Sequence, residues 1–375
     1  MISGSIKKKI MLLSLLLPIG AAVFVFLSLN NSSPSALPPV KPICLEASDK
    51  YSCIYEQVSI GYENFNLAYA LSVLRAEVES GGEESRLICH PVAHKFGSDI
   101  GSQKDSLNEM LDLVTIAGEN ARLCDFGFVH GSLEGYADSN GADLMIEIAD
   151  DMCSEVSSNV LETDLCFHGL GHSIFIGYKY DYQNAVKGCE SFEPVLTGTC
   201  VSGVIMEWAI HPSENRESSF LVDDPALKYW PRLCESFQGE SRNGCLSQVW
   251  HALRLYPQSD ERRDSRFAIK YCEDTYNGDD LNYCIDGVGR LYWADGYPSP
   301  KQASEMCAVA SDDEIYLTCL VGYASSRGVQ YLQAEKTIEV CDESKVELKA
   351  ECLKRARIVA KGQDMVSDPI RDRKG

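Results

Sequence analysis

Regularly spaced cysteine pairs are the feature that most constrains the fold of this chain. The sequence contains sixteen cysteines, and all of them lie after residue 43. The second members of the later pairs recur every 33 to 45 residues, a period typical of repeated helical hairpins. Within each pair the two cysteines lie 11 to 13 residues apart, and the pairs are Cys153/Cys166, Cys189/Cys200, Cys234/Cys245, Cys272/Cys284, Cys307/Cys319 and Cys341/Cys352.

The residues around each pair predict a helical hairpin. A helix-like stretch such as RFAIKYC (266–272) precedes the first cysteine, polar turn-forming residues such as TYNGDDLNY (275–283) follow it, and a second helical stretch such as CIDGVGRLYW (284–293) begins at the second cysteine. Each unit is therefore helix A, a loop and helix B, with a disulfide at the turn. Closing a loop of about a dozen residues stabilises a fold by roughly 3 kcal/mol in the entropic model.

The first four cysteines do not follow this spacing. Cys89 and Cys124 open two further B helices but have no cysteine partner on their own A helices. We expect them to bridge each other across neighbouring hairpins, which leaves Cys44 with Cys53. The spacing alone leaves other connectivities open.

Glycine recurs three residues after the second cysteine of several units. Glycine inside a helix costs about 1 kcal/mol relative to alanine. Its repetition at one register therefore indicates that B helices approach each other closely there. The positions are Gly127, Gly169, Gly203, Gly287 and Gly322.

These patterns predict an all-α fold: a right-handed solenoid of about eight disulfide-stapled helical hairpins over residues 44–362, followed by a polar tail at 363–375. In plan this arrangement resembles tetratricopeptide-type and other disulfide-bridged helical-repeat proteins. The resemblance is one of architecture.

The N-terminus predicts export. Three lysines at positions 7–9 precede an apolar run at 10–29, which is about the length that a membrane-spanning helix needs. The lysines place residues 1–9 in the cytoplasm, and the absence of a small-residue cleavage site favours an uncleaved signal anchor over a cleaved signal peptide and secretion. A stalk rich in proline and serine at 30–43 joins this anchor to an extracytoplasmic domain at 44–362. An even number of cysteines, all beyond the apolar run, agrees with an exported, disulfide-bonded domain.

The charge balance excludes one class of partner. The chain has 55 acidic against 34 basic residues, a formal net charge of -21. Such a surface repels phosphate backbones, so nucleic acid is not expected as a partner. It accommodates cations and basic or peptidic partners.

Closely spaced histidines and glutamates are the main functional signal. Side chains four residues apart on a helix can reach one ion. The chain has seven histidines, yet four successive B helices carry such a pair: His90/His94, His130/Glu134, His168/His172 and Glu207/His211. Because the later B helices carry none, the repeat itself does not explain these pairs.

The positions of these pairs relative to the second cysteine indicate that the first three helices share one site. At about 100° per residue, His168/His172 and His130/Glu134 share adjoining directions, whereas Glu207 and His211 are expected to point away. Pro212 also places His211 at a helix end, and His251 is a lone histidine that we expect to pack or to hydrogen-bond. The arrangement is similar in plan to helical-repeat hydroxylases that carry histidine–glutamate pairs on successive repeats.

The sequence therefore predicts a site for zinc, iron, manganese or copper, with Glu134 or Glu207 as a general base. Alternatively, the histidines make only ordinary hydrogen bonds, or neighbouring cysteines ligate as thiolates. Other residues nearby are Tyr136 and Tyr178, which line a pocket or belong to the core, and Asp99 and Asp125, which orient imidazoles or face solvent. The expected ligands are His90, His94, His130, Glu134, His168 and His172.

Three functions are compatible with these features. The first is a membrane-anchored, extracytoplasmic metal-dependent enzyme, a hydrolase or an oxidoreductase. The second is a binding scaffold for a basic or peptidic partner, in which the histidines do not converge. The third is metal storage or sensing, in which the ion has no open coordination position.

Overall fold

The computed structural model describes residues 38–117, 120, 123–124, 126–157, 160–210, 234–251, 265–294, 298–331 and 334–364. The chain divides into two units, residues 1–40 and 41–375, and the helices given below all lie in the second. The expected anchor at 10–29, the cytoplasmic end at 1–9, most of the stalk and of the tail, Asp125 and His211 lie outside the described residues. Within those ranges, no helix combines the length and the apolar character that crossing a membrane requires.

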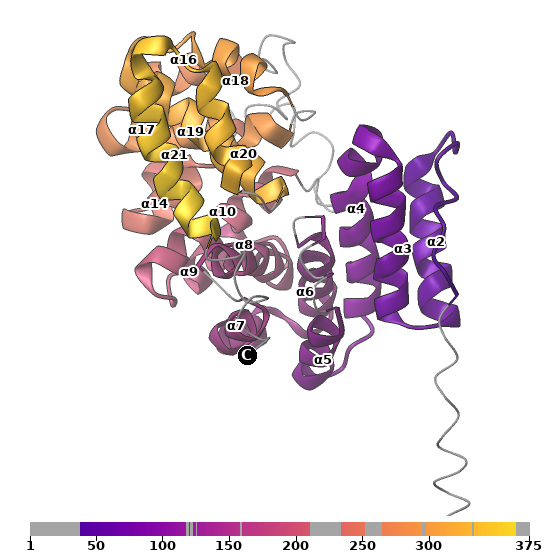
Figure 1. The fold of residues 1–375 in the computed structure, drawn as a ribbon. Helices are drawn as coiled ribbons and strands as arrows, with labels where there is room; N and C mark the ends of the chain where they lie inside the picture. The colour runs from indigo at the N-terminus through magenta and orange to yellow at the C-terminus, as the bar shows by residue number, and fades with distance from the viewer. Residues whose placement is uncertain are drawn as a thin grey trace, which may run out of the picture. The chain divides into compact units, whose positions relative to one another are not determined.

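The described part of the chain is helical throughout and contains no strand (Figure 1). The helices of the N-terminal half are α2 (Lys50–Asn64), α3 (Leu67–Ser80), α4 (Gly82–Gly101), α5 (Leu107–Ala117), α6 (Gly127–Asn140), α7 (Ala142–Val156), α8 (Val160–Gly177), α9 (Tyr182–Cys189) and α10 (Pro194–Ile210). Those of the C-terminal half are α14 (Gly239–Leu246), α16 (Ser265–Thr275), α17 (Gly278–Ala294), α18 (Pro300–Cys307), α19 (Asp313–Tyr331), α20 (Ala334–Glu339) and α21 (Lys349–Asp364), with short 3-10 turns at Val340–Glu343 and Val346–Leu348.

The B helices contact one another in chain order. Helix α4 packs on α6, α6 on α8, α8 on α10 and α10 on α14, and the contacts continue through α17 and α19 to α21. The A helices α3, α5, α7 and α9 also contact one another in chain order. Side chains on neighbouring B helices therefore meet although they lie about 35 residues apart in the sequence, as the hydrogen bond between His168 and Ser202 illustrates.

All sixteen cysteines form disulfides. The pairs are those that the sequence favours: Cys44–Cys53, Cys89–Cys124, Cys153–Cys166, Cys189–Cys200, Cys234–Cys245, Cys272–Cys284, Cys307–Cys319 and Cys341–Cys352. With no free cysteine, no thiolate is left to hold a metal ion, so the thiolate alternative is wrong. Eight disulfides indicate an oxidising location, extracytoplasmic or secreted.

A buried glutamate fixes the start of the domain. The Glu77 carboxylate on α3 accepts hydrogen bonds from the backbone N–H of Ile43 at 2.6 Å and of Cys44 at 3.2 Å. Glu77 is buried, and bonds of this kind to a charged group stabilise by about 1.5–3 kcal/mol each. Together with the Cys44–Cys53 disulfide, this attaches Ile43 and Cys44 to α2 and α3.

Glycines let the B helices touch backbone to backbone. A Cβ atom added at Gly131 of α6 would lie 1.9 Å from the carbonyl oxygen of His94 on α4. One added at Gly203 of α10 would lie 2.0 Å from the carbonyl oxygen of His168 on α8, and one at Gly287 of α17 would lie 2.1 Å from that of Ser247. Any side chain at these positions would push the helices apart. The recurring glycine expected from the sequence to mark close packing thus does so in the structure.

We predict that Gly287→Ala destabilises the domain by about 1–3 kcal/mol, because the added methyl group overpacks a backbone contact. Chemical denaturation with the disulfides intact measures this. Gly61→Ala on α2 is the matched control, since its added Cβ would lie 3.3 Å from its nearest neighbour and the change stays within about 1 kcal/mol. Equal effects of the two substitutions would contradict the role assigned to the close contact.

Candidate metal centre

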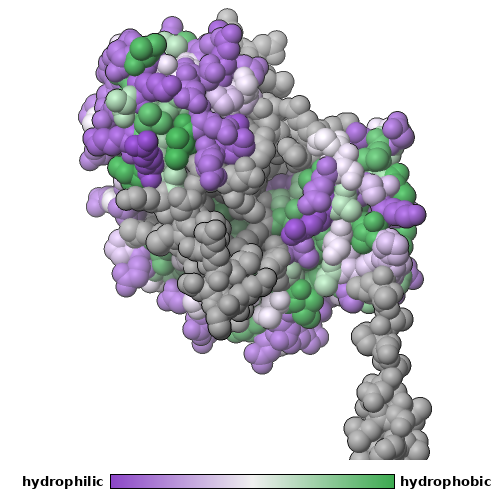
Figure 2. Space-filling view, in the orientation of Figure 1, coloured by the Kyte–Doolittle hydropathy of each residue, from purple (hydrophilic) through white to green (hydrophobic). Residues whose placement is uncertain are grey.

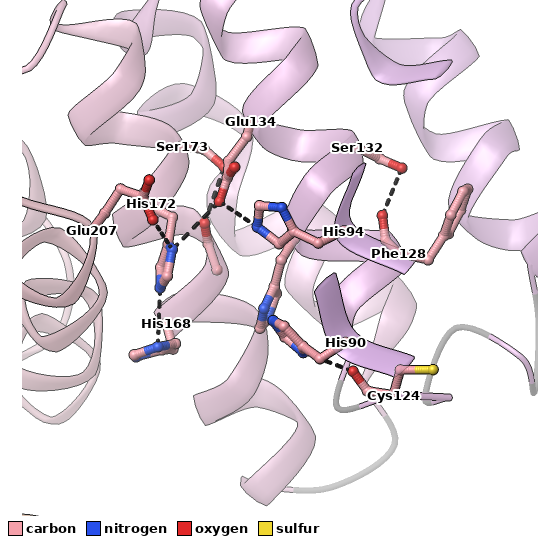
Figure 3. A network of polar contacts seen from close by, with 12 residues as sticks. His90, His94, Cys124, Phe128, Ser132, Glu134, His168, His172, Ser173 and Glu207 are labelled. Carbon is pink, nitrogen blue, oxygen red and sulfur yellow. Dashed lines mark hydrogen bonds and ion pairs between the residues drawn. The ribbon is translucent and has the colours of Figure 1, made fainter. Parts of the chain in front are cut away.

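The site forms where α4, α6, α8 and α10 contact one another in turn (Figure 3). Each of these B helices contributes to it, and the contributed side chains are largely buried. The close glycine contacts set the spacing of the helices here too: Gly131 packs on the backbone of His94, Gly203 on that of His168, and Gly169 lies against the ring of His130. Neighbouring helices this close bring short side chains such as histidine within direct contact.

Three ligand atoms converge in the centre of the site. His94, Glu134 and His172 each present one ligand atom, and these atoms lie within 4.8 Å of one another. His94 Nε2 is 2.9 Å from Glu134 Oε1, and His172 Nδ1 is 3.4 Å from the same oxygen. Two imidazole nitrogens and a carboxylate oxygen so placed can hold a divalent ion, whose bonds to such ligands are about 2.0–2.2 Å long.

Glu207 joins this group, contrary to the expectation that it points away. Its Oε2 accepts a hydrogen bond from His172 Nδ1 at 2.7 Å, and the side chain is buried. The expectation was wrong because it required all helices to face one common direction. A B helix in a row has neighbours on two sides, so α8 meets α6 with one face and α10 with another.

His168 lies on the other side of His172. The Nε2 atoms of the two rings are 3.1 Å apart, and His168 Nδ1 contacts Ser202 Oγ at 2.8 Å. Figure 3 shows His172 between the two glutamates and His168. Ser202 was not among the residues expected in the site. The signal was present in the sequence, because Ser202 follows Cys200 by two residues as His168 follows Cys166.

His90 and His130 flank the centre, and each donates a hydrogen bond to a backbone carbonyl. His90 Nδ1 donates to Cys124 at 2.8 Å, and His130 Nε2 donates to Leu165 at 3.1 Å. The ring of His130 has its centroid 5.8 Å from that of His90, 6.1 Å from His168 and 5.9 Å from His172. The histidines therefore converge, but among the described residues the group with three atoms close enough for one ion is His94, Glu134 and His172.

Burial and charge set the protonation of the histidines in opposite directions. Burial, together with the nearby charge of His94, lowers the pKa of His90 to about 4. Burial also lowers the pKa of His130 and of His168 well below the ordinary value, with neighbouring histidines adding to the effect. These three rings are therefore neutral at pH 7, and each retains one nitrogen lone pair.

The remaining groups form a charged cluster. Burial opposes charge on His172, but Glu134 and Glu207 outweigh it and raise the pKa of His172 to about 10. Burial likewise opposes charge on His94, and Glu134 outweighs it and raises that pKa. Burial opposes charge on Glu134, but His94 and His172 outweigh it and lower its pKa to about 2. Without an ion, the proton on His172 therefore balances the negative charge of Glu134 at pH 7.

Other residues noted in the sequence lie outside this cluster. Asp99 pairs with Lys95 at 2.5 Å and accepts a hydrogen bond from the Tyr55 hydroxyl, so it orients no imidazole here. Tyr136 is a buried core residue, and the Tyr178 hydroxyl donates to Asp143 at 2.8 Å.

Comparison with family models, with curated proteins and with solved structures finds no match to this chain. The interpretation of the site therefore depends on its geometry and chemistry.

We predict that His172 of the metal-free protein keeps both ring protons at pH 8, where an ordinary histidine with a pKa near 6.5 is neutral. Because its folded-state pKa is raised to about 10, its contribution to stability is full below pH 6.5 and is lost as the pH rises towards 10. Ring ¹⁵N chemical shifts, assigned with a His172→Gln variant, measure the protonation state.

Glu134→Gln provides the comparison for this measurement. Removing one of the two carboxylates lowers the pKa of His172, so the ring loses a proton at a lower pH than in the wild-type chain. An unchanged titration in Glu134→Gln would contradict the assigned cause.

Proposed function

We propose that the chain is an extracytoplasmic metalloenzyme whose ion is held by His94, Glu134 and His172. The observation that carries the proposal is the convergence of three ligand atoms within 4.8 Å, from three consecutive B helices. Buried ionisable groups that converge in this way are a hallmark of functional sites.

The three ligands limit which metal ions, and therefore which classes of reaction, the site is suited to. Two histidines and one carboxylate hold the zinc of several hydrolases and the ferrous iron of many oxygenases, and manganese and copper accept the same donor types. Three protein ligands leave coordination positions open for water and substrate. An ion bound there supplies Lewis acidity, which lowers the pKa of water and polarises carbonyl or phosphoryl oxygens.

Glu207 favours hydrolysis over oxidation among these chemistries. It is a second buried carboxylate, held 2.7 Å from a nitrogen of the ligand His172. When His172 Nδ1 donates its electron pair to an ion, Glu207 Oε2 loses that hydrogen-bond donor and is free to accept a proton from a water molecule in the site. This is the role of a general base, and Glu134 is then a ligand rather than a base.

The setting of the enzyme is part of the proposal. The apolar run at 10–29 anchors the chain in a cell membrane with residues 1–9 in the cytoplasm, and the repeats at 44–362 form a right-handed solenoid outside it. Hydrophilic side chains predominate over α16–α21 on the face shown in Figure 2. The net charge of -21 of the whole chain suits a basic or peptidic substrate or partner.

The test is the metal content of the folded, oxidised domain. We predict about one zinc, iron, manganese or copper ion per chain by elemental analysis, and loss of that ion in His172→Ala and in Glu134→Gln. His90→Asn is the matched control. It removes a neighbouring imidazole, keeps an N–H donor for the Cys124 carbonyl and retains the ion. A wild-type chain without stoichiometric metal would refute the proposal.

A separate measurement tests Glu207. We predict that Glu207→Gln retains the ion but lowers turnover of ester, amide or phosphoester probe substrates by about 10²–10⁴-fold, the usual effect of losing a general base. Loss of the ion in this variant would instead identify Glu207 as a fourth ligand and would favour storage or sensing.

A further inference from the structure

A series of hydrogen bonds begins at His172, on the side of its ring that faces away from Glu134 and Glu207. It runs from His172 Nε2 to His168 Nε2 at 3.1 Å, from His168 Nδ1 to Ser202 Oγ at 2.8 Å, and from Ser202 Oγ to the carbonyl oxygen of Thr199 at 2.7 Å. All of these groups lie on the packed helices α8 and α10.

We infer that His168 is a positioning residue and not a metal ligand: it holds the proton of His172 on Nε2 and so directs the Nδ1 lone pair of His172 to the ion. The inference rests on the proposed function, since it assigns a role around the same ion. It departs from the sequence-based expectation that His168 is a ligand.

The direction of each hydrogen bond follows from the end of the series. The Thr199 carbonyl can only accept, so the Ser202 hydroxyl donates its proton to it. The Ser202 oxygen therefore accepts from His168, which places the His168 proton on Nδ1. In that tautomer the lone pair of His168 lies on Nε2, 3.1 Å from Nε2 of His172, and the hydrogen bond between them has His172 as its donor.

The two nitrogens of His172 face different surroundings. Nδ1 lies 2.7 Å from Glu207 Oε2 and 3.4 Å from Glu134 Oε1, whereas Nε2 faces His168. These nitrogens are separated by a ring carbon and diverge, so a group that contacts Nε2 lies on the side of the ring away from the Nδ1 ligand position. His168 accordingly does not belong to the three-atom cluster found within the described residues.

This arrangement is the usual support of a ligating histidine. The nitrogen that does not bind the ion donates its proton to a fixed acceptor, which sets the tautomer and the ring orientation and raises the basicity of the ligand. Loss of such a partner typically weakens metal affinity by about 10–100-fold. Ser202 has the supporting role of keeping His168 in the tautomer that can accept.

The experiment compares His168→Leu with His168→Gln in the otherwise intact, oxidised domain. Leucine removes the acceptor, whereas the glutamine side-chain oxygen reaches about as far as Nε2 and still accepts a proton from His172. We expect one Zn²⁺ per chain in the wild type and in both variants, with affinity about 10–100-fold weaker in His168→Leu and within about 3-fold of wild type in His168→Gln. Competition with a chromophoric chelator measures the affinity, and thermal unfolding of each metal-free variant measures folding.

Ser202→Ala extends the test, and Ser132→Ala is its control. Both serines are buried and donate to a carbonyl of their own helix, but Ser132 on α6 donates to the Phe128 carbonyl, and among the described residues it has no hydrogen bond to His168 or His172. We expect weaker Zn²⁺ binding in Ser202→Ala and unchanged binding in Ser132→Ala. A second measurement on His168→Gln uses Co²⁺ in place of Zn²⁺. We expect the d–d absorption spectrum to keep its wild-type shape, because the ligands of the ion are unchanged.

The outcomes separate the inference from the proposed function. Two ions in the wild type and one in His168→Gln would make His168 a ligand of a second ion and overturn the inference. Unchanged affinity in a folded His168→Leu variant would overturn it as well, while the three-ligand centre would stand. A wild-type chain that binds no Zn²⁺ or other ion would overturn the centre and this inference together.

Discussion

Direct backbone contact between successive B helices is the constraint on which the site depends. Where Gly131 packs on the His94 carbonyl and Gly203 on the His168 carbonyl, no side chain separates the helices. At ordinary helix spacing of about 8–10 Å, larger residues would fill the interface and histidine and glutamate would not reach across it. The same glycines that weaken each helix on its own therefore allow four helices to share one polar cluster.

The sequence was sufficient to predict the repeat and its six hairpin disulfides, because a regular spacing such as that between Cys153 and Cys166 or between Cys272 and Cys284 indicates a local hairpin. Histidine pairs such as His168/His172 likewise identified the helices that build the site, since side chains four residues apart lie together on any helix. Both features depend on residues that are close in the sequence, so the sequence alone is enough to predict them.

The predictions that were wrong depend on which face one helix presents to the next. A helical wheel assigns Glu207 a direction on its own helix but contains no information on which side of α8 that helix packs, and the carboxylate proved to contact His172. For the same reason the wheel could not separate a ligand from the residue that supports it. His168 and His172 lie on one face of α8, yet one contacts Ser202 and the other contacts two carboxylates.

Charge balance argues that this cluster serves a function and not the stability of the fold. Glu134 and Glu207 are both buried, with His94 Nε2 2.9 Å from Glu134 Oε1 and His172 Nδ1 2.7 Å from Glu207 Oε2. Replacing a buried ion pair by well-packed apolar residues is often neutral or stabilising by about 1–4 kcal/mol. A divalent cation bound between these residues would place positive charge beside both carboxylates. The helical core keeps two buried carboxylates beside three neutral histidines, and hydrogen bonds orient the rings of those histidines. Such an arrangement is suited to holding an ion.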